Sequence, residues 1–358
     1  MEKPSSTLMA AVGAAGLLAA AFQRGRTIPV TEPLRPGRRH AGKSKASRGL
    51  GHDATSPEEI PARGWWQVLK RTVLQSDEDR LLTEAAGITF FTLLALFPAI
   101  AALVSLYGLF ADPVTIWRHF ETLDGLVPGG GMDIIKDQVQ RIAAKGSGTL
   151  GFSLAIGLAT SLWSANQAIK ALFDALNVVF EEKEKRGFFR LNAETLGFTF
   201  AALVFVLLAI AAVVALPVAL ALFGIGAGAD LLLRLSRWPV LLGTMTFFLA
   251  CVYRYGPSRR KAKWRWVTWG GAAASLLWVA VSAGFSFYVA QFGAYNTTYG
   301  SLGAVIGFMT WIWLSSAVVL LGAELDAELE RQTEQDTISG GAKPPGARGA
   351  RMADTTAG

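Results

Sequence analysis

The stretch AAGITFFTLLALFPAIAALVSLYGLF, residues 85–110, carries no charged side chain. An α-helix rises about 1.5 Å per residue and the apolar core of a bilayer is about 30 Å thick, so about 20 apolar residues are enough to cross it. Helices in the core of a soluble protein rarely stay uncharged for so long. The stretch therefore predicts a helix that crosses a membrane.

Other uncharged stretches follow this one along the chain. Only 17% of all residues are charged, whereas a soluble domain carries about 25%. These features predict an all-α fold, a polytopic transmembrane helical bundle with Pro-kinked helices and amphipathic interfacial helices. We expect six main spans near 85–110, 148–168, 196–222, 238–254, 268–290 and 302–323.

Composition divides the chain into three regions. Residues 1–60 combine an apolar segment, 8–22, with a disordered basic linker, residues 61–333 form the six-span membrane domain, and residues 334–358 form a disordered tail. Segment 8–22 has three readings: an extra span, an interfacial helix or a cleaved signal. The segment before it has no net positive charge, which argues against a signal.

Amphipathic helices are expected beside the spans. Residues 62–75 place Trp66, Leu69 and Val73 on one helical face, which suits a helix at the bilayer interface or one packed on its neighbours. Residues 111–147 are expected to form two short helices on the membrane face. The second span is expected to continue as one long helix beyond the bilayer.

The distribution of Lys and Arg predicts the orientation. With the linker placed inside, 27 Lys and Arg residues fall on the cytoplasmic side and 7 on the other. This bias follows the positive-inside rule. We therefore expect a multi-pass membrane protein, with the linker before the first main span and the C-terminal tail in the cytoplasm. Basic loops facing membrane lipids also account for the net charge of +7 without nucleic acid.

Prolines and polar residues within the spans point to a cavity. A proline removes a backbone donor, so Pro98 is expected to kink the first span, either to shape a cavity or as a static feature of packing. Candidate cavity-lining residues are Pro98, Trp163, Asn166, Gln167 and Tyr299. The alternative for each polar residue is a hydrogen bond between helices. The acids of GAELDAELERQTEQD (322–336) are expected either to face solvent or to pair with the basic loop 254–265.

Side chains suited to catalysis or metal binding are sparse. There is one cysteine, Cys251, and the histidines His40, His52 and His119 lack metal-ligand spacing. No nucleotide-binding or hydrolase motif is present. We therefore expect no catalytic site, no metal, no cofactor and no enzyme activity.

Four stretches together resemble the YihY/BrkB family of bacterial inner-membrane proteins: AAGITFFTLLALFP (85–98), LWSANQAIKALFDALNVVF (162–180), YRYGPSRRKAKWRWVTWGGAAA (253–274) and YNTTYGSLGAVIGFMTWIWLSSAVVLLGAELDAELE (295–330). The resemblance covers roughly 60–333. It implies six spans with both ends cytoplasmic. The family was once labelled ribonuclease BN, but no clustered carboxylates or histidines here support nuclease chemistry.

Two functions remain in view. The first is transport or flipping of a lipid or small solute through a cavity between kinked spans. The second is a non-transporting scaffold for envelope assembly. The sequence leaves the substrate, the energy source and the oligomeric state open.

Overall fold

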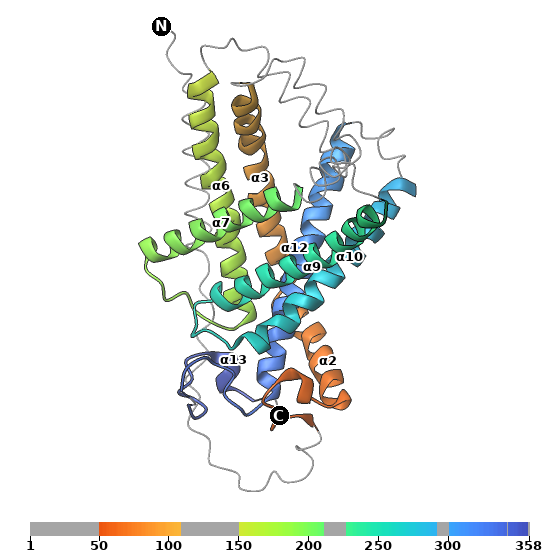
Figure 1. Cartoon of the computed structure of the whole chain (residues 1–358). Coiled ribbons are helices and arrows are strands. Elements are labelled where there is room, and N and C mark those ends of the chain that lie inside the picture. Colours follow the sequence, from red (N-terminus) through yellow and green to blue (C-terminus); the bar gives the residue numbers. More distant parts are fainter. Residues whose placement is uncertain (1–49, 109–149, 211–226, 292–300, 342, 357–358) are drawn as a thin grey trace. The chain divides into compact units, whose positions relative to one another are not determined.

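The computed structural model describes residues 50–108, 150–210, 227–291, 301–341 and 343–356. Within these ranges the regular structure is helical, apart from one isolated antiparallel bridge between Ala262 and Ile338. Segment 8–22, the expected helices of 111–147, and Tyr299 lie outside the described residues. The all-α prediction is confirmed for the described part (Figure 1).

Each of the six predicted spans overlaps one long helix, and residues 109–110, 148–149 and 211–222 of these spans lie outside the described part. The described elements are η2 (Pro57–Glu59), α2 (Ala62–Glu78), α3 (Leu81–Gly108), α6 (Leu150–Val179), α7 (Phe188–Ile210), α9 (Ala227–Tyr255), α10 (Trp264–Gln291), α12 (Ser301–Gln332) and α13 (Arg351–Asp354). Helix α6 runs well beyond the apolar stretch, as predicted, and α3 continues through Pro98.

Within the described residues, three helices are long and apolar enough to cross a membrane by length and composition: Phe188–Val206, Trp264–Val289 and Val305–Gln332. A shorter apolar helix covers Leu81–Leu96. The apolar stretches of α7 and α10 are each only 11% buried in the protein. A surface this apolar needs contact with lipid. The chain is thus a helical membrane protein, while the number of six spans remains a prediction.

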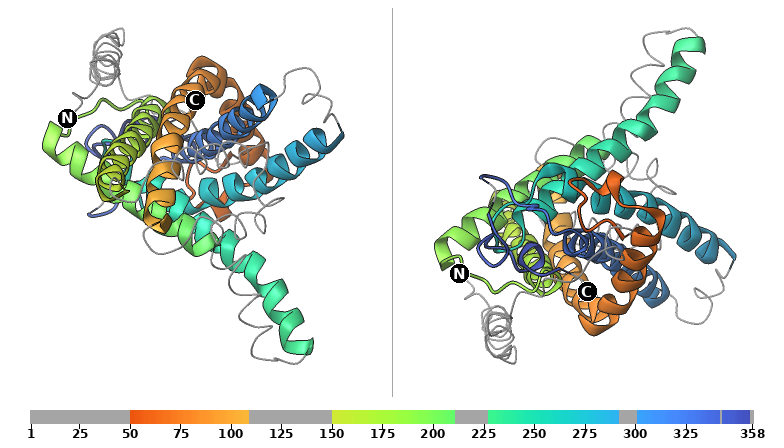
Figure 2. Two further views of the ribbon diagram at one scale, coloured as in Figure 1. Left: turned by 90° about the horizontal axis from the view of Figure 1, so that it is seen from above. Right: turned by 90° about the horizontal axis from the view of Figure 1, so that it is seen from below.

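Helix α12 lies between two other sets of long helices and packs on a member of each. Helix α3 lies beside both α6 and α12, and α10 lies beside both α9 and α12 (Figures 1 and 2). Gly270 sets the distance between α10 and α12, because a Cβ atom there would stand 2.2 Å from the carbonyl oxygen of Gly322. Small residues allow this close approach in membrane helices.

Hydroxyl groups in the helices are satisfied in two ways. Thr89 and Thr92 donate to the carbonyls of Ala85 and Ile88, one turn earlier in α3. These two threonines therefore bond within their own helix and not across helices. Contacts between helices come from other pairs, namely Tyr253 with the Val319 carbonyl at 2.7 Å, Trp278 with Ser315 at 3.0 Å and Thr246 with Ser275 at 3.2 Å.

The acids at the charged end of α12 are buried, so the expectation of a solvent-facing row is wrong. Glu324, Asp326, Glu328 and Glu330 all have 0% exposure. Glu330 forms a two-pronged ion pair with Arg259, at 2.6 and 2.9 Å. Glu330 thus pairs with the loop 254–265, whereas Glu328 pairs with Arg71 and Arg331 instead, so the expected pairing holds for one acid of this row. These arginines compensate the burial of Glu328 and Glu330, whereas Glu324 has no such partner among the described residues.

Helix α2 exposes its apolar face. Trp66 is 70% exposed and Val73 67%, and Leu69 is exposed too, whereas Val68 and Thr72 are buried against the protein. The predicted face Trp66–Leu69–Val73 therefore points away from the protein, as a helix at a bilayer interface requires. Arg71 anchors α2 through a 2.5 Å contact with Glu328 of α12.

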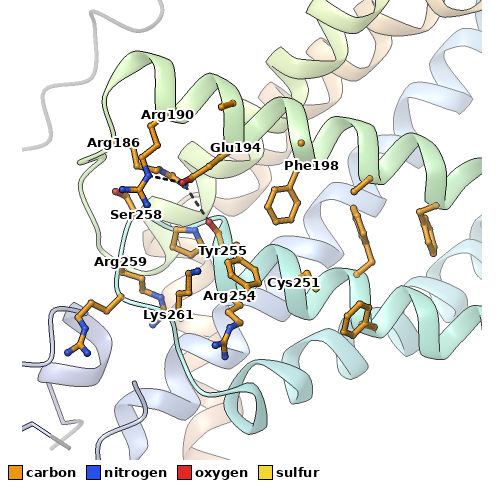
Figure 3. Close-up of a pocket in the computed structure, with 18 of the residues that line it drawn as sticks. Arg186, Arg190, Glu194, Phe198, Cys251, Arg254, Tyr255, Ser258, Arg259 and Lys261 are labelled. Carbon is orange, nitrogen blue, oxygen red and sulfur yellow. Dashed lines mark hydrogen bonds and ion pairs between the residues drawn. The ribbon is translucent and has the colours of Figure 1, made fainter. Parts of the chain in front are cut away.

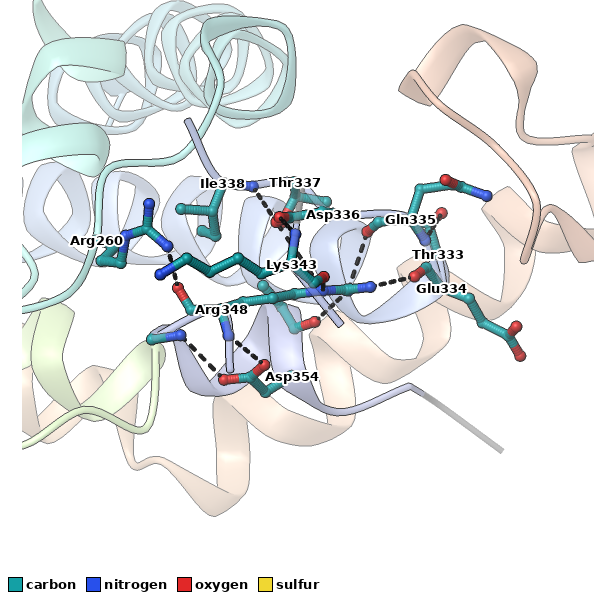
Figure 4. A network of polar contacts seen from close by, with 12 residues as sticks. Arg260, Thr333, Glu334, Gln335, Asp336, Thr337, Ile338, Lys343, Arg348 and Asp354 are labelled. Atoms are coloured by element: carbon teal, nitrogen blue, oxygen red, sulfur yellow. Dashed lines mark hydrogen bonds and ion pairs between the residues drawn. The ribbon is translucent and has the colours of Figure 1, made fainter. Parts of the chain in front are cut away.

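Both predicted disordered ends contain folded residues, and the structure corrects these limits. Residues 50–54 accept hydrogen bonds from the end of α12: Gln332 donates to the Leu50 carbonyl at 2.6 Å, and Thr333 to the Ala54 carbonyl at 2.6 Å. In the tail, Arg348 is buried and donates to the carbonyls of Glu334, Gln335, Lys343 and Ala353 (Figure 4). One buried guanidinium thus organises a segment whose polar composition predicted disorder.

Candidate functional site

Three of the five predicted cavity residues, Trp163, Asn166 and Gln167, have described side chains, and all three lie on α6. Trp163 is 43% exposed on α6, Gln167 is half-buried, and Asn166 is buried with no hydrogen-bond partner for its Oδ1 among the described residues. The side chain of Pro98, like Tyr299, lies outside the described part. None of the three described side chains lines the pocket described below, and the role of all five residues in a cavity stays a prediction.

The pocket is a groove of about 920 Å³ between α7 and α9. Helix α7 packs on α6 and helix α9 packs on α10, which leaves the space between α7 and α9 open. The floor is aromatic: Phe205 of α7 stacks on Phe248 of α9 with ring centroids 5.4 Å apart. Phe198, Phe247 and small or aliphatic residues complete this apolar part (Figure 3). Its surface suits a hydrocarbon chain.

Positive charge gathers at one end of the groove. Seven basic residues line it and one acid, Glu194, accompanies them. The basic residues come from the α6–α7 loop, the first turn of α7, the end of α9 and the α9–α10 loop: Lys185, Arg186, Arg190, Arg254, Arg259, Arg260 and Lys261 (Figure 3). The groove is thus amphipathic, with a phenylalanine-lined part and a cationic end.

Several of these cations hold the loops in place. Arg186 bonds to Glu184, to Glu194 and to the Gly256 carbonyl, and so joins the α6–α7 loop to the end of α9. Burial opposes ionisation of Glu184, but its hydrogen bonds and charge contacts with Arg186 outweigh this and lower its pKa to about 2. The pair therefore stays ionised at neutral pH, and Arg186 serves the fold.

Other cations that line the groove are less committed to ion pairs. The side chain of Arg190 is 73% exposed, with one contact to Glu194 at 2.8 Å. The side chain of Lys185 is 61% exposed and contacts Glu182. The Lys261 ammonium lies 4.6 Å from the ring centroid of Tyr255. Arg190 and Lys261 can bind a further anion without losing a buried ion pair, whereas Lys185 also contacts the buried Glu182.

Sequence reasoning missed the groove because it read the basic loops only as a topology signal. Loops 170–190 and 254–265 each follow an apolar stretch and carry many of the positive charges. The available signal was that two basic loops adjoin two aromatic-rich spans. The sequence did not show that α7, which packs on α6, and α9, which packs on α10, line the same groove. Within the described residues, no group of three or more His, Cys, Asp or Glu side chains is arranged to hold a metal ion.

Comparison with known proteins identifies the family. The family model described as "Virulence factor BrkB" matches residues 72–345. The chain is 29% identical over 259 residues to the ribonuclease-like protein YfkH of Bacillus subtilis, a match covering 70% of this chain and 90% of that protein. It is also 26% identical over 287 residues to the UPF0761 membrane protein PSHAa0171 of Pseudoalteromonas translucida, covering 76% and 88%.

A further relative is the UPF0761 membrane protein of Aeromonas salmonicida, 29% identical over 259 residues and covering 70% of this chain and 84% of that protein. No solved structure matches the chain significantly. The matched region contains the described long helices from α3 to α12 and every groove-lining residue except Gly349. The chain therefore belongs to the BrkB family of membrane proteins.

Proposed function

We propose that the chain binds an anionic lipid in the groove between α7 and α9 and moves it within or across the bacterial inner membrane, without catalysing a reaction. The observation that carries this proposal is the amphipathic lining: one groove joins a wall of phenylalanines to a cluster of arginines and lysines. A lipid has the same division into an apolar chain and a charged headgroup.

The apolar part supplies affinity and an entry route. Each buried methylene group contributes about 0.8 kcal/mol, so even part of one acyl chain gives useful binding. The outer face of α7 is exposed and apolar, with Phe200 at 66% and Leu208 at 62% exposure. A lipid in the surrounding leaflet would therefore meet a continuous apolar surface up to the groove.

The basic end supplies the preference for negative charge. Arginine and lysine are the side chains that bind phosphate oxygens most readily, and each cation near an anionic membrane surface contributes about 1 kcal/mol. The loops that carry these cations lie at the same end of the helices as α2 and the C-terminal segment (Figure 1). This supports placing that end, with the linker and tail, in the cytoplasm.

The first test measures lipid binding. The full-length chain in detergent is titrated with vesicles or micelles of phosphatidylglycerol and, separately, of phosphatidylcholine. The variant Arg190→Gln/Lys261→Gln removes two exposed positive charges, and we expect at least about tenfold weaker binding of phosphatidylglycerol. The control Arg63→Gln removes an exposed charge from α2, and binding is expected to change little. Equal loss in the control would show non-specific attraction to charge.

The second test is movement of lipid in liposomes that contain the reconstituted chain. Transfer of a fluorescent phosphatidylglycerol between leaflets should exceed that in empty liposomes. Ala201→Trp fills the groove and should abolish the transfer, whereas Val206→Trp, on the same helix outside the lining, should keep it. Binding without movement would favour the scaffold function, and release of a small zwitterionic solute would favour solute transport.

A further inference from the structure

Asp79 and Glu324 are acids from distant parts of the chain whose carboxyl groups meet inside the protein. Asp79 follows the last residue of α2, and Glu324 lies on α12. Glu324 has 0% exposure, and neither carboxylate oxygen has a hydrogen-bond partner among the described residues. Asp79 Oδ2 is also buried without a partner, whereas Oδ1 accepts from Gln75 Nε2 at 3.3 Å.

The surroundings of this pair contain little positive charge. Glu78 of α2 and Glu181, which follows α6, face Asp79, while Glu328 and Arg331 of α12 face Glu324. Arg331 already donates to Glu328 at 2.8 Å. Glu328 and Glu330 thus each have an arginine partner, and the Asp79–Glu324 pair has none of its own among the described residues.

Two ionised carboxylates cannot be held together in such a place at low cost. A buried ion without a partner loses its solvation, and two like charges in contact repel strongly at low dielectric. A pair of carboxyl groups relieves both effects by keeping one proton between them. Burial, with help from the neighbouring acids, also raises the pKa of Asp79 to about 6.

We propose that Asp79 and Glu324 form a proton-binding pair, which holds one proton at neutral pH and loses it when the pH rises. The proton forms a hydrogen bond between the two carboxyl groups and so joins the α2–α3 junction to α12. Its loss places two negative charges in contact and weakens that junction. Arg80, beside Asp79, has a φ of 53°, so the chain reverses sharply there. This inference does not depend on lipid binding in the groove.

The experiment is infrared difference spectroscopy of the full-length chain in lipid nanodiscs, with the pH raised from about neutral to about 10. The carbonyl stretch of a protonated carboxyl group should be present at neutral pH and should be lost as the pH rises. Glu324→Gln should remove this band, because its amide can donate to Asp79 and leave that residue ionised. The exposed Glu334→Gln should leave the band unchanged.

Further variants keep the proposal open to refutation. Asp326 also has an unpartnered buried oxygen, and Asp326→Asn identifies any band that belongs to it. Should Glu324→Gln fail to insert, Asp79→Asn must change the frequency of the same band, because it removes the hydrogen-bond partner. The proposal is overturned if the neutral-pH spectrum of the wild type matches that of Glu324→Gln, or if Asp79→Asn leaves the band unchanged.

Discussion

Replacing Glu330 with glutamine removes the charge that balances Arg259 in the protein interior. Both side chains have 0% exposure, and the guanidinium reaches the two carboxylate oxygens at 2.6 and 2.9 Å. Removing one partner of such a buried pair costs about 3–5 kcal/mol, because the remaining charge stays without compensation. We expect Glu330→Gln to fall in this range, since Arg259 can leave the interior only by pulling the α9–α10 loop with it.

Arg259 keeps one of its contacts in the Glu330→Gln variant. The Arg259 guanidinium lies 3.9 Å from the ring centroid of Phe180, a cation–π contact that contributes about 0.5–2 kcal/mol. The double variant Arg259→Met/Glu330→Leu removes both charges and should cost less than the two single variants added together. The comparison therefore measures the coupling between the two side chains.

The assay is unfolding of the purified chain in mixed micelles, with increasing denaturing detergent at constant lipid content. Exposed Glu334→Gln is the control and should stay within about 0.5 kcal/mol of the wild type. A loss below about 1 kcal/mol for Glu330→Gln would refute the reasoning. It would mean that water or another cation already compensates Arg259.

Three more predictions concern other parts of the fold. In α10, Gly270→Ala should lower the thermal midpoint of unfolding strongly because its Cβ meets the α12 backbone, whereas Gly284→Ala, with nothing within 4 Å, should leave it unchanged or raise it; equal effects would contradict this packing. Because burial raises the pKa of Asp79 from 3.8 to about 6, its folded form binds a proton more tightly than its unfolded form. The free energy of unfolding of the wild type relative to Asp79→Asn should thus fall, by at most about 3 kcal/mol, as the pH rises from about 4 to about 6; a rise in that window would contradict the sign. Arg348→Ala leaves four carbonyls without their donor and should make the C-terminal segment sensitive to limited proteolysis, whereas Arg351→Gln, at a side chain that is 50% exposed, should not; equal sensitivity would argue against Arg348 as the anchor.

Contacts at the two ends of the folded region show where sequence patterns are insufficient. Residues 334–356 are polar and rich in glycine, so composition predicts disorder, yet the buried Arg348 gives them a fixed arrangement. Glu328 and Glu330 belong to a row of acids that sequence composition would place in solvent, yet Arg71 and Arg259 arrive from other elements and allow these two to be buried. In both cases the deciding partner is distant in the sequence.

The sequence by itself determined that this is a helical membrane protein and where its long helices lie. Uncharged length and hydropathy are properties of consecutive residues, so they can be read without the fold. The family rests on the stretches 85–98, 162–180, 253–274 and 295–330, which resemble it, and on the match over residues 72–345. Only the tertiary structure decided that the groove lies between α7 and α9 and that Asp79 meets Glu324. The physical reason is that such sites need side chains that are distant in sequence to lie close together away from water. Only the packing of the helices brings those side chains together.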